Sequence, residues 1–258
     1  MISDATTRDE VLSEIRATQE QITKLDQYVA LLDEWQKGLS LIGPGTIDQV
    51  WQRHILDSAQ LRQHIDPSAG LIMDIGSGAG FPGLVLAILY GDQLKYPMKL
   101  VESDGRKCRF LETVIAETGA KAMVVNERLE HLELMWPYMI LARAVASLDK
   151  LLVWTERQQH PGLTCLFMKG KKANEELTAL KNYPKIKVTS TPSITHPDGV
   201  ILCLKGFRLT QTVRQTPRSH KKPKAKPNMG KMSATQRRDK PQKTNESSRY
   251  VLISIFFP

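Results

Sequence analysis

Residues 8–39 carry apolar side chains at three- and four-residue steps, with charged residues between them. This spacing places an apolar stripe on one face of a helix, so it predicts helical structure over the whole segment. A Gly-Pro-Gly sequence interrupts the pattern after residue 42, and a second segment of helical pattern covers residues 46–61. We therefore expect residues 1–66 to form an N-terminal helical cap.

Beyond residue 66 the pattern changes to short apolar runs that lie between segments of helical pattern. Five of these runs are predicted to be strands, over residues 71–74, 99–102, 122–126, 139–143 and 164–168. Such alternation is typical of parallel strands joined by crossover helices. Two later strands, 185–189 and 199–206, flank a turn and predict a terminal antiparallel hairpin. Residues 67–207 are thus expected to form an α/β domain with a doubly wound, mostly parallel sheet.

The most informative segment is a glycine loop between the first strand and the helix after it. Residues 71–84 read LIMDIGSGAGFPGL, with Asp74 just before Gly76 and Gly78. Glycines allow a tight turn, and the bare N–H groups of such a loop can hold a polar cofactor. The G-x-G-x-G spacing favours S-adenosylmethionine over a dinucleotide, whose loop has the form G-x-G-x-x-G. Glu102 ends the second strand, where an acid can bind ribose hydroxyls.

Composition and charge limit the remaining possibilities. The chain has 258 residues and a net charge of +9, and residues 208–249 carry thirteen Lys or Arg against two acids. The basic character therefore belongs to this tail, which we expect to be disordered in isolation. Residues 250–258 are a short apolar segment that is either an edge strand or loose. The three cysteines lack metal-ligand spacing, and we expect no metal site, reduced thiols and a cytoplasmic location. No apolar run approaches the length of a membrane span.

Several motifs occur together in one order along residues 28–206. They are RHILDS at 53–58, the loop DIGSGAGFPG, Glu102 followed by KCRFL at 107–111, RAVASL at 143–148 and MKG at 168–170. In this combination the chain resembles the bacterial small-subunit ribosomal RNA guanine-N7 methyltransferase G family, also called glucose-inhibited division protein B. It departs from the family in having Ser40-Leu41 where Asn-Leu is usual, and in its longer, more basic C-terminal segment.

The resemblance implies a class I S-adenosylmethionine-dependent methyltransferase fold. It also implies methyl transfer to N7 of a guanine in the decoding region of 16S ribosomal RNA, on the free RNA or on a small-subunit particle. Guanine N7 carries a free lone pair, so catalysis needs alignment and exclusion of water more than a general base. The expected state is a monomer that does not bind membranes. A nucleotide-dependent oxidoreductase and a non-catalytic RNA-binding scaffold on the same fold are the alternatives.

Site residues follow from the motifs and from the resemblance together. The predicted cofactor contacts are Asp74, Gly76, Gly78, Phe81, Glu102, Leu129, Glu130 and Arg143, of which the resemblance alone places Leu129 and Glu130 at the adenine. Arg143 and Lys169 end the fourth and fifth strands and are the predicted catalytic residues. The predicted RNA contacts are Arg53, His54 and Lys169, the first two from the resemblance alone. The competing structural interpretations are a helix staple for Phe81, a buried hydrogen-bonded His54, an ion pair for Arg143 and a solvated strand end for Lys169.

Overall fold

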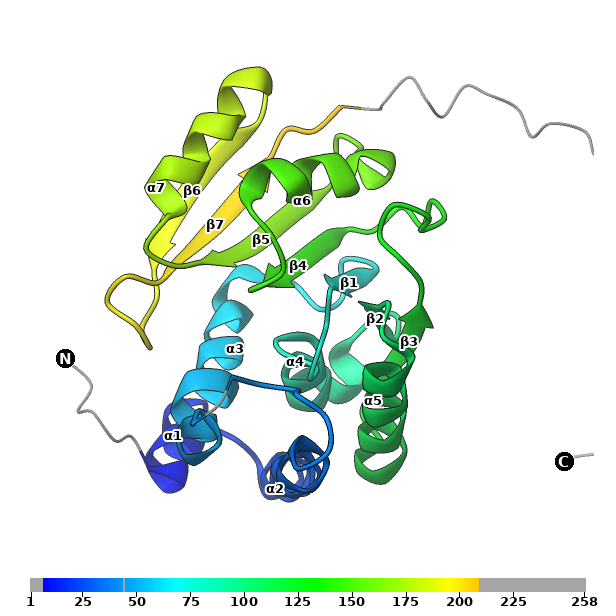
Figure 1. The fold of residues 1–258 in the computed structure, drawn as a ribbon, viewed down its shortest axis with the longest axis vertical. Helices are drawn as coiled ribbons and strands as arrows, with labels where there is room; N and C mark the ends of the chain where they lie inside the picture. Colours follow the sequence, from blue (N-terminus) through cyan, green and yellow to red (C-terminus); the bar gives the residue numbers. More distant parts are fainter. Residues whose placement is uncertain (1–6, 44, 209–258) are drawn as a thin grey trace, which may run out of the picture. The chain divides into compact units, whose positions relative to one another are not determined.

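A computed structural model describes residues 7–43 and 45–208 of the chain, which form one seven-stranded sheet (Figure 1). The strand order is β3-β2-β1-β4-β5-β7-β6. β1 to β5 are parallel, and β7 pairs antiparallel with both β5 and β6. The strands are β1 (Ile72–Ile75), β2 (Met98–Glu102), β3 (Ala122–Asn126), β4 (Met139–Arg143), β5 (Thr164–Lys169), β6 (Lys187–Pro192) and β7 (Val200–Lys205).

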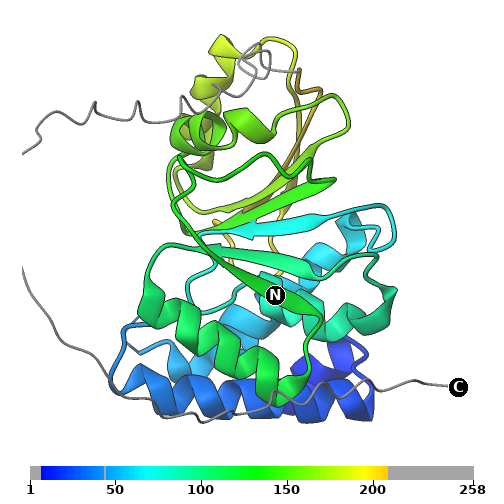
Figure 2. The same cartoon turned by 90° about the vertical axis from the view of Figure 1, so that its right-hand side faces the viewer.

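Helices cover both faces of the sheet (Figure 2). The α-helices are α1 (Arg8–Glu14), α2 (Gln19–Gln36), α3 (Asp57–Ala59), α4 (Gly83–Tyr90), α5 (Gly105–Thr118), α6 (Leu148–Trp154) and α7 (Ala173–Glu176). The shorter helical segments are η1 (Ile47–Gln49), η2 (Trp51–Leu56, a π-helix), η3 (Gln60–His64), η4 (Gly91–Gln93), η5 (Glu156–Gln158) and η6 (Leu177–Asn182).

Two apolar cores lie on opposite sides of the sheet. The larger core joins the sheet to α4, α5 and the N-terminal helices, and α4 is buried along its whole length. The smaller core joins the other face of the sheet to α6 and the segment after β5. The mostly parallel sheet, the helical cap and the terminal antiparallel hairpin confirm the predicted class I methyltransferase fold.

The N-terminal cap differs from the sequence prediction in one respect. The helical structure predicted over residues 8–39 is divided into two helices, because α1 ends before Arg16, which has a φ of 52°. α2 then starts afresh at Thr18, whose side chain accepts a hydrogen bond from Gln21 N–H while the Gln21 side chain accepts from Thr18 N–H. This capping box satisfies two backbone N–H groups at the helix start, so it stabilises a new helix at this residue.

Two further elements differ from their predictions. No helix joins β3 to β4, because Trp136 has a φ of 53° and Pro137 follows it, and neither suits a helix interior. The first strand of the hairpin covers Lys187–Pro192 and not 185–189, whereas its partner strand and the turn before Gly199 agree with the prediction.

The predicted basic tail and the apolar C-terminal segment lie outside the described residues from 209 onward. Within residues 7–43 and 45–208, no helix is both long and apolar enough to cross a membrane.

Candidate active site

The glycine loop after β1 is tied by its backbone to the end of β2. Gly76 N–H donates to the Val101 carbonyl at 2.8 Å, and Gly78 N–H donates to Glu102 Oε2 at 2.9 Å. Gly76 has a φ of +67°, and a Cβ at this position would lie 2.7 Å from both methyl carbons of Val145. Glycine is therefore required here on two grounds, the left-handed backbone and the close approach of the loop after β4.

A cavity of about 300 Å³, here called the β1–β3 cavity, opens beside this loop at the carboxyl ends of the first three strands. Four of the predicted cofactor residues line it, namely Gly76, Glu102, Leu129 and Glu130. The apolar part of its lining also includes Val101, Val145 and Trp154, and Glu127 adds a third carboxylate. The structure thus brings together residues from three separate segments that the sequence places at one sheet edge.

The β1–β3 cavity has the chemistry that S-adenosylmethionine requires. Apolar side chains suit the faces of an adenine ring, and carboxylates suit ribose hydroxyls and a sulfonium charge. Glu102 already accepts three backbone N–H donors: Gly78 at Oε2, and Ser103 and Asp104 at Oε1, at 2.7 and 2.8 Å. A carboxylate offers about four acceptor positions. Glu102 can therefore accept one ribose hydroxyl while all three of these bonds persist.

Asp74 lies beneath the glycine loop and is fully buried. Its Oδ2 accepts a hydrogen bond from Gly83 N–H at the start of α4, at 3.1 Å, and its Oδ1 has no partner among the described residues. Burial raises the pKa of Asp74 to about 7, against the opposing effect of the Gly83 N–H. Asp74 therefore supports the loop from below and is not part of the cavity lining, and a direct cofactor contact stays a prediction.

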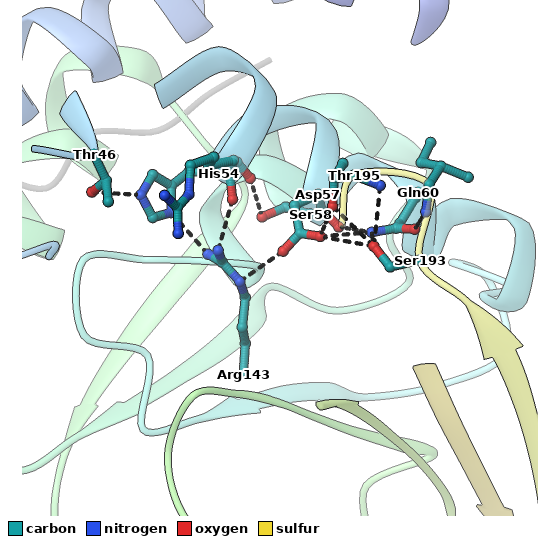
Figure 3. A network of polar contacts seen from close by, with 10 residues as sticks. Thr46, His54, Asp57, Ser58, Gln60, Arg143, Ser193 and Thr195 are labelled. Atoms are coloured by element: carbon teal, nitrogen blue, oxygen red, sulfur yellow. Dashed lines mark hydrogen bonds and ion pairs between the residues drawn. The ribbon is translucent and has the colours of Figure 1, made fainter. Parts of the chain in front are cut away.

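Arg143, at the end of β4, is held by three groups from the N-terminal cap (Figure 3). Its Nε lies 2.8 Å from Asp57 Oδ2, one NH group lies 3.0 Å from His54 Nδ1, and the other donates to the Arg53 carbonyl at 2.7 Å. The side chains of Arg143 and Asp57 are 20% and 13% exposed. Asp57 therefore pairs with Arg143.

His54 is buried and uncharged in this arrangement. Burial, reinforced by the positive charges of Arg143 and Arg53, lowers the pKa of His54 to about 3. Arginine has no acceptor, so His54 Nδ1 accepts from Arg143, and Nε2 carries the proton and donates to Thr46 Oγ1 at 3.2 Å. The Thr46 hydroxyl donates in turn to a backbone carbonyl. Every polar atom of the imidazole is thus satisfied within the protein.

Phe81 packs in the same region, beneath the imidazole. Its ring stacks on His54 and on Tyr28, with centroid separations of 4.8 and 5.3 Å. The Arg143 guanidinium carbon lies 5.9 Å from the Phe81 centroid. The structure places Phe81 in the contact between cap and sheet, and a contact with the cofactor stays a prediction.

A second cavity of about 360 Å³, here called the β4–β7 cavity, lies at the carboxyl ends of β4 and β5. Arg143 and Lys169 both line it. The Lys169 side chain is 8% exposed, and its ammonium lies 2.7 Å from Glu176 Oε2 and donates to the Ala146 carbonyl. The same carboxylate accepts from Leu148 N–H at the start of α6. Lys169 is thus an ion-paired residue that helps to hold the loop after β4, and not a solvated strand end.

The hairpin loop between β6 and β7 contributes residues that sequence reasoning missed (Figure 3). The Thr195 hydroxyl donates to Asp57 Oδ1, and Gln60 Nε2 donates to the same atom at 2.8 Å. Gln60 also accepts from Ile194 N–H at 3.0 Å. The contacts of the hairpin loop join residues more than a hundred positions apart, so no local pattern in the sequence predicts them.

Known proteins with similar sequences decide the family. The profile described as rRNA small subunit methyltransferase G matches residues 21–196. The ribosomal RNA small subunit methyltransferase G of Paramagnetospirillum magneticum is 41% identical over 197 residues, which is 76% of this chain and 94% of the relative. That of a Methylorubrum extorquens strain is 44% identical over 180 residues, which is 69% of this chain and 84% of the relative.

The chain belongs to this family. Membership in the methyltransferase G family confirms the predicted resemblance. Together with the fold, it also confirms the prediction that the chain is a methyltransferase that uses S-adenosylmethionine. The oxidoreductase alternative is therefore excluded. The roles of individual residues stay predictions, and the geometry above supplies the basis for proposing them.

Proposed function

We propose that this methyltransferase G family member transfers a methyl group from S-adenosylmethionine to N7 of a guanine in the decoding region of 16S ribosomal RNA. The name of its relatives, ribosomal RNA small subunit methyltransferase G, supports small-subunit ribosomal RNA as the substrate. The proposed setting is the bacterial cytoplasm, on free 16S RNA or an assembling small-subunit particle, with the enzyme working as a monomer.

One observation carries the proposal: three consecutive residues at the end of β4 and in the loop after it line two different cavities. Val145 lines the β1–β3 cavity, while Arg143 and Ala144 line the β4–β7 cavity. Ala144 has a φ of 54°, a backbone conformation that costs energy for a residue with a side chain and is often found at functional sites. The arrangement suits a reaction in which cofactor and base approach each other from opposite sides of this loop.

The chemistry that remains for the protein is alignment. Bound S-adenosylmethionine supplies an electrophilic methyl group on a sulfonium. Guanine N7 is unprotonated at neutral pH, so no residue has to remove a proton before N7 attacks. Arg143 has five N–H donors, of which three are used within the protein. The two that remain face the β4–β7 cavity in this proposal, where they donate to guanine O6 and leave N7 free.

The predicted RNA residues take different roles in the proposal. Arg53 is exposed, so its guanidinium can bind phosphate. His54 acts by holding Arg143 and does not contact RNA. Lys169 uses two of its three N–H donors on Glu176 and Ala146, which leaves one for the substrate beside its role in the loop.

The test uses RNA in which guanine is replaced by 7-deazaguanine, where a C–H group takes the place of N7. We expect labelled methyl transfer to transcripts of the decoding region with ordinary guanine, and none to the 7-deaza transcript. A matched transcript with 7-deazaadenine controls for effects of the altered base on RNA folding. Equal transfer to the ordinary and the 7-deazaguanine transcripts would show that another atom receives the methyl group.

A further inference from the structure

A hollow of about 710 Å³ lies at the amino edge of the sheet, opposite the candidate active site. Its lining comes from segments that precede or begin parallel strands: residues 69–71 before β1, 95–97 before β2, 135–138 before β4 and 160–162 before β5. Because the strands are parallel, all of these segments meet at one edge. The hollow is therefore separate from both cavities of the candidate active site.

Two large aromatic side chains stand half exposed at this hollow. Tyr96 and Trp136 are each 50% exposed and line it from two different segments. The ring of His160 lies 5.3 Å from that of Trp136 and also lines the hollow. Trp136 has a φ of 53°, a strained backbone conformation for a bulky residue. Exposed aromatic rings are a usual platform on which unpaired bases stack.

The charge at the hollow is positive. Lys95 and Lys99 both line it, and the Lys95 ammonium lies 5.7 Å from the Tyr96 ring centroid. Within residues 7–43 and 45–208, neither lysine forms an ion pair with a carboxylate. An open aromatic hollow with uncompensated ammonium groups suits a polyanion that carries planar rings.

The last strand of the terminal hairpin also ends at this edge. β7 runs antiparallel to β5, so its last residue, Lys205, lies at the amino edge. The sequence from 208 to 249 carries thirteen Lys or Arg and two acids. The strand that precedes this basic sequence thus ends at the edge that bears the hollow, and β7 is the neighbour of β5 in the sheet.

We propose that the hollow at the amino edge is a second RNA site, which binds unpaired nucleotides of the ribosomal RNA by stacking bases on Tyr96 and Trp136 and holding phosphates at Lys95 and Lys99. The proposal rests on the proposed function, since it assigns this surface to the same RNA substrate. A strand of four to six residues spans roughly 13–20 Å. The hollow and the active site lie at opposite ends of such strands, so an RNA bound at the active site needs to extend by about one strand length to reach the hollow. Lysine is depleted in protein–protein interfaces and enriched where phosphate is bound, so RNA fits this surface better than a second copy of the chain.

The first test measures methyl transfer to 16S RNA with the full-length Tyr96→Ala and Trp136→Ala proteins. Loss of one base stack is expected to raise KM for RNA roughly 5- to 150-fold, with unchanged kcat and unchanged affinity for S-adenosylmethionine. Trp136→Phe retains a stacking ring and is expected to stay near the wild-type KM. Val153→Ala removes a side chain on α6 that is 58% exposed and does not line the hollow, and it serves as the matched control.

A second test separates the phosphate contacts from the stacking. The Lys95→Ala, Lys99→Ala double variant is expected to lower the slope of log affinity against log salt by about two, and Lys150→Ala is its control. Unchanged KM and unchanged salt slope in all of these variants would overturn the second site while leaving the methylation intact. A shift in oligomeric state with unchanged RNA affinity would overturn it in favour of a protein contact.

Failure of the proposed function gives a different result. If the wild-type protein does not methylate 16S RNA, the hollow is tested by fluorescence anisotropy with a labelled single-stranded oligoribonucleotide. Weaker binding by Tyr96→Ala and Trp136→Ala than by Val153→Ala supports the site, and equal binding by all three overturns it.

Discussion

The ion pair between Arg143 and Asp57 is predicted to be energetically strong, and a double-mutant cycle measures it directly. The four proteins are wild type, Asp57→Asn, Arg143→Gln and the double variant. The atoms lie 2.8 Å apart, and the two side chains are only 20% and 13% exposed. Exposed ion pairs contribute about 0.2–1 kcal/mol, whereas hydrogen bonds to charged groups shielded from water contribute about 1.5–3 kcal/mol. We therefore expect a coupling free energy of about 2 kcal/mol.

Equilibrium unfolding in urea at neutral pH gives the free energy of unfolding of each protein. The contacts of Asp57 with Thr195 and Gln60 are affected alike in both proteins that carry the Asp57→Asn substitution, so they cancel in the cycle. The pair Lys24 and Glu20 on α2 is the control, because the Glu20 side chain is 76% exposed and the expected coupling is about 0.3–0.5 kcal/mol. A coupling for Arg143 and Asp57 no larger than that of the control would refute the reasoning.

Three further predictions concern the loop and the buried titratable groups. Gly76→Ala is expected to lower the free energy of unfolding by roughly 2–4 kcal/mol and to weaken cofactor binding measured by calorimetry. Gly119 has a similar φ but open space around it, so Gly119→Ala is expected to show only the cost of the backbone strain. Equal losses of stability in the two variants would contradict this prediction. The pKa of His54 is about 3 in the folded protein and about 6.5 in the unfolded chain, so the stability that neutral His54 contributes is lost as pH falls below about 6.5. In urea unfolding, the free energy of unfolding of His54→Asn is therefore expected to fall less steeply with decreasing pH than that of wild type. The same pH dependence in both proteins would contradict this prediction. The pKa of Asp74 is about 7 in the folded protein and about 3.9 in the unfolded chain, so stability is lost as pH rises from about 4 to 7. The free energy of unfolding of Asp74→Asn is therefore expected to increase relative to that of wild type across this range. A difference between the two proteins that does not change with pH would contradict this prediction.

The sequence predicts the sheet and the glycine loop well because their signals are local. The apolar runs, the helical segments between most of them and the glycine spacing each act within a few residues, and parallel strands bring their ends to one edge. Glu102 could therefore be placed beside Gly76 in advance, whereas Leu129 was placed there by the resemblance alone. The helix break at Arg16 was missed although the capping residues Thr18 and Gln21 are readable in the sequence.

The support of Arg143 could not be predicted, because it depends on packing between distant segments. Asp57 lies in the same RHILDS motif as Arg53 and His54, yet its partner Arg143 is 86 positions away in the sequence. Lys169 is similar: nothing near it in sequence shows that Glu176, beyond a turn, folds back onto its ammonium. Charged residues at strand ends therefore identify the site, while only the tertiary structure separates free charges from paired ones.

The most direct test of the account is transfer of a labelled methyl group from S-adenosylmethionine to 16S RNA purified from cells that lack this gene. Nuclease digestion and chromatography then identify the modified nucleoside. The account predicts label in 7-methylguanosine at one site in the decoding region. Label in another nucleoside or in protein would contradict the proposed substrate, and absence of transfer to both free RNA and small-subunit particles would contradict the proposed activity.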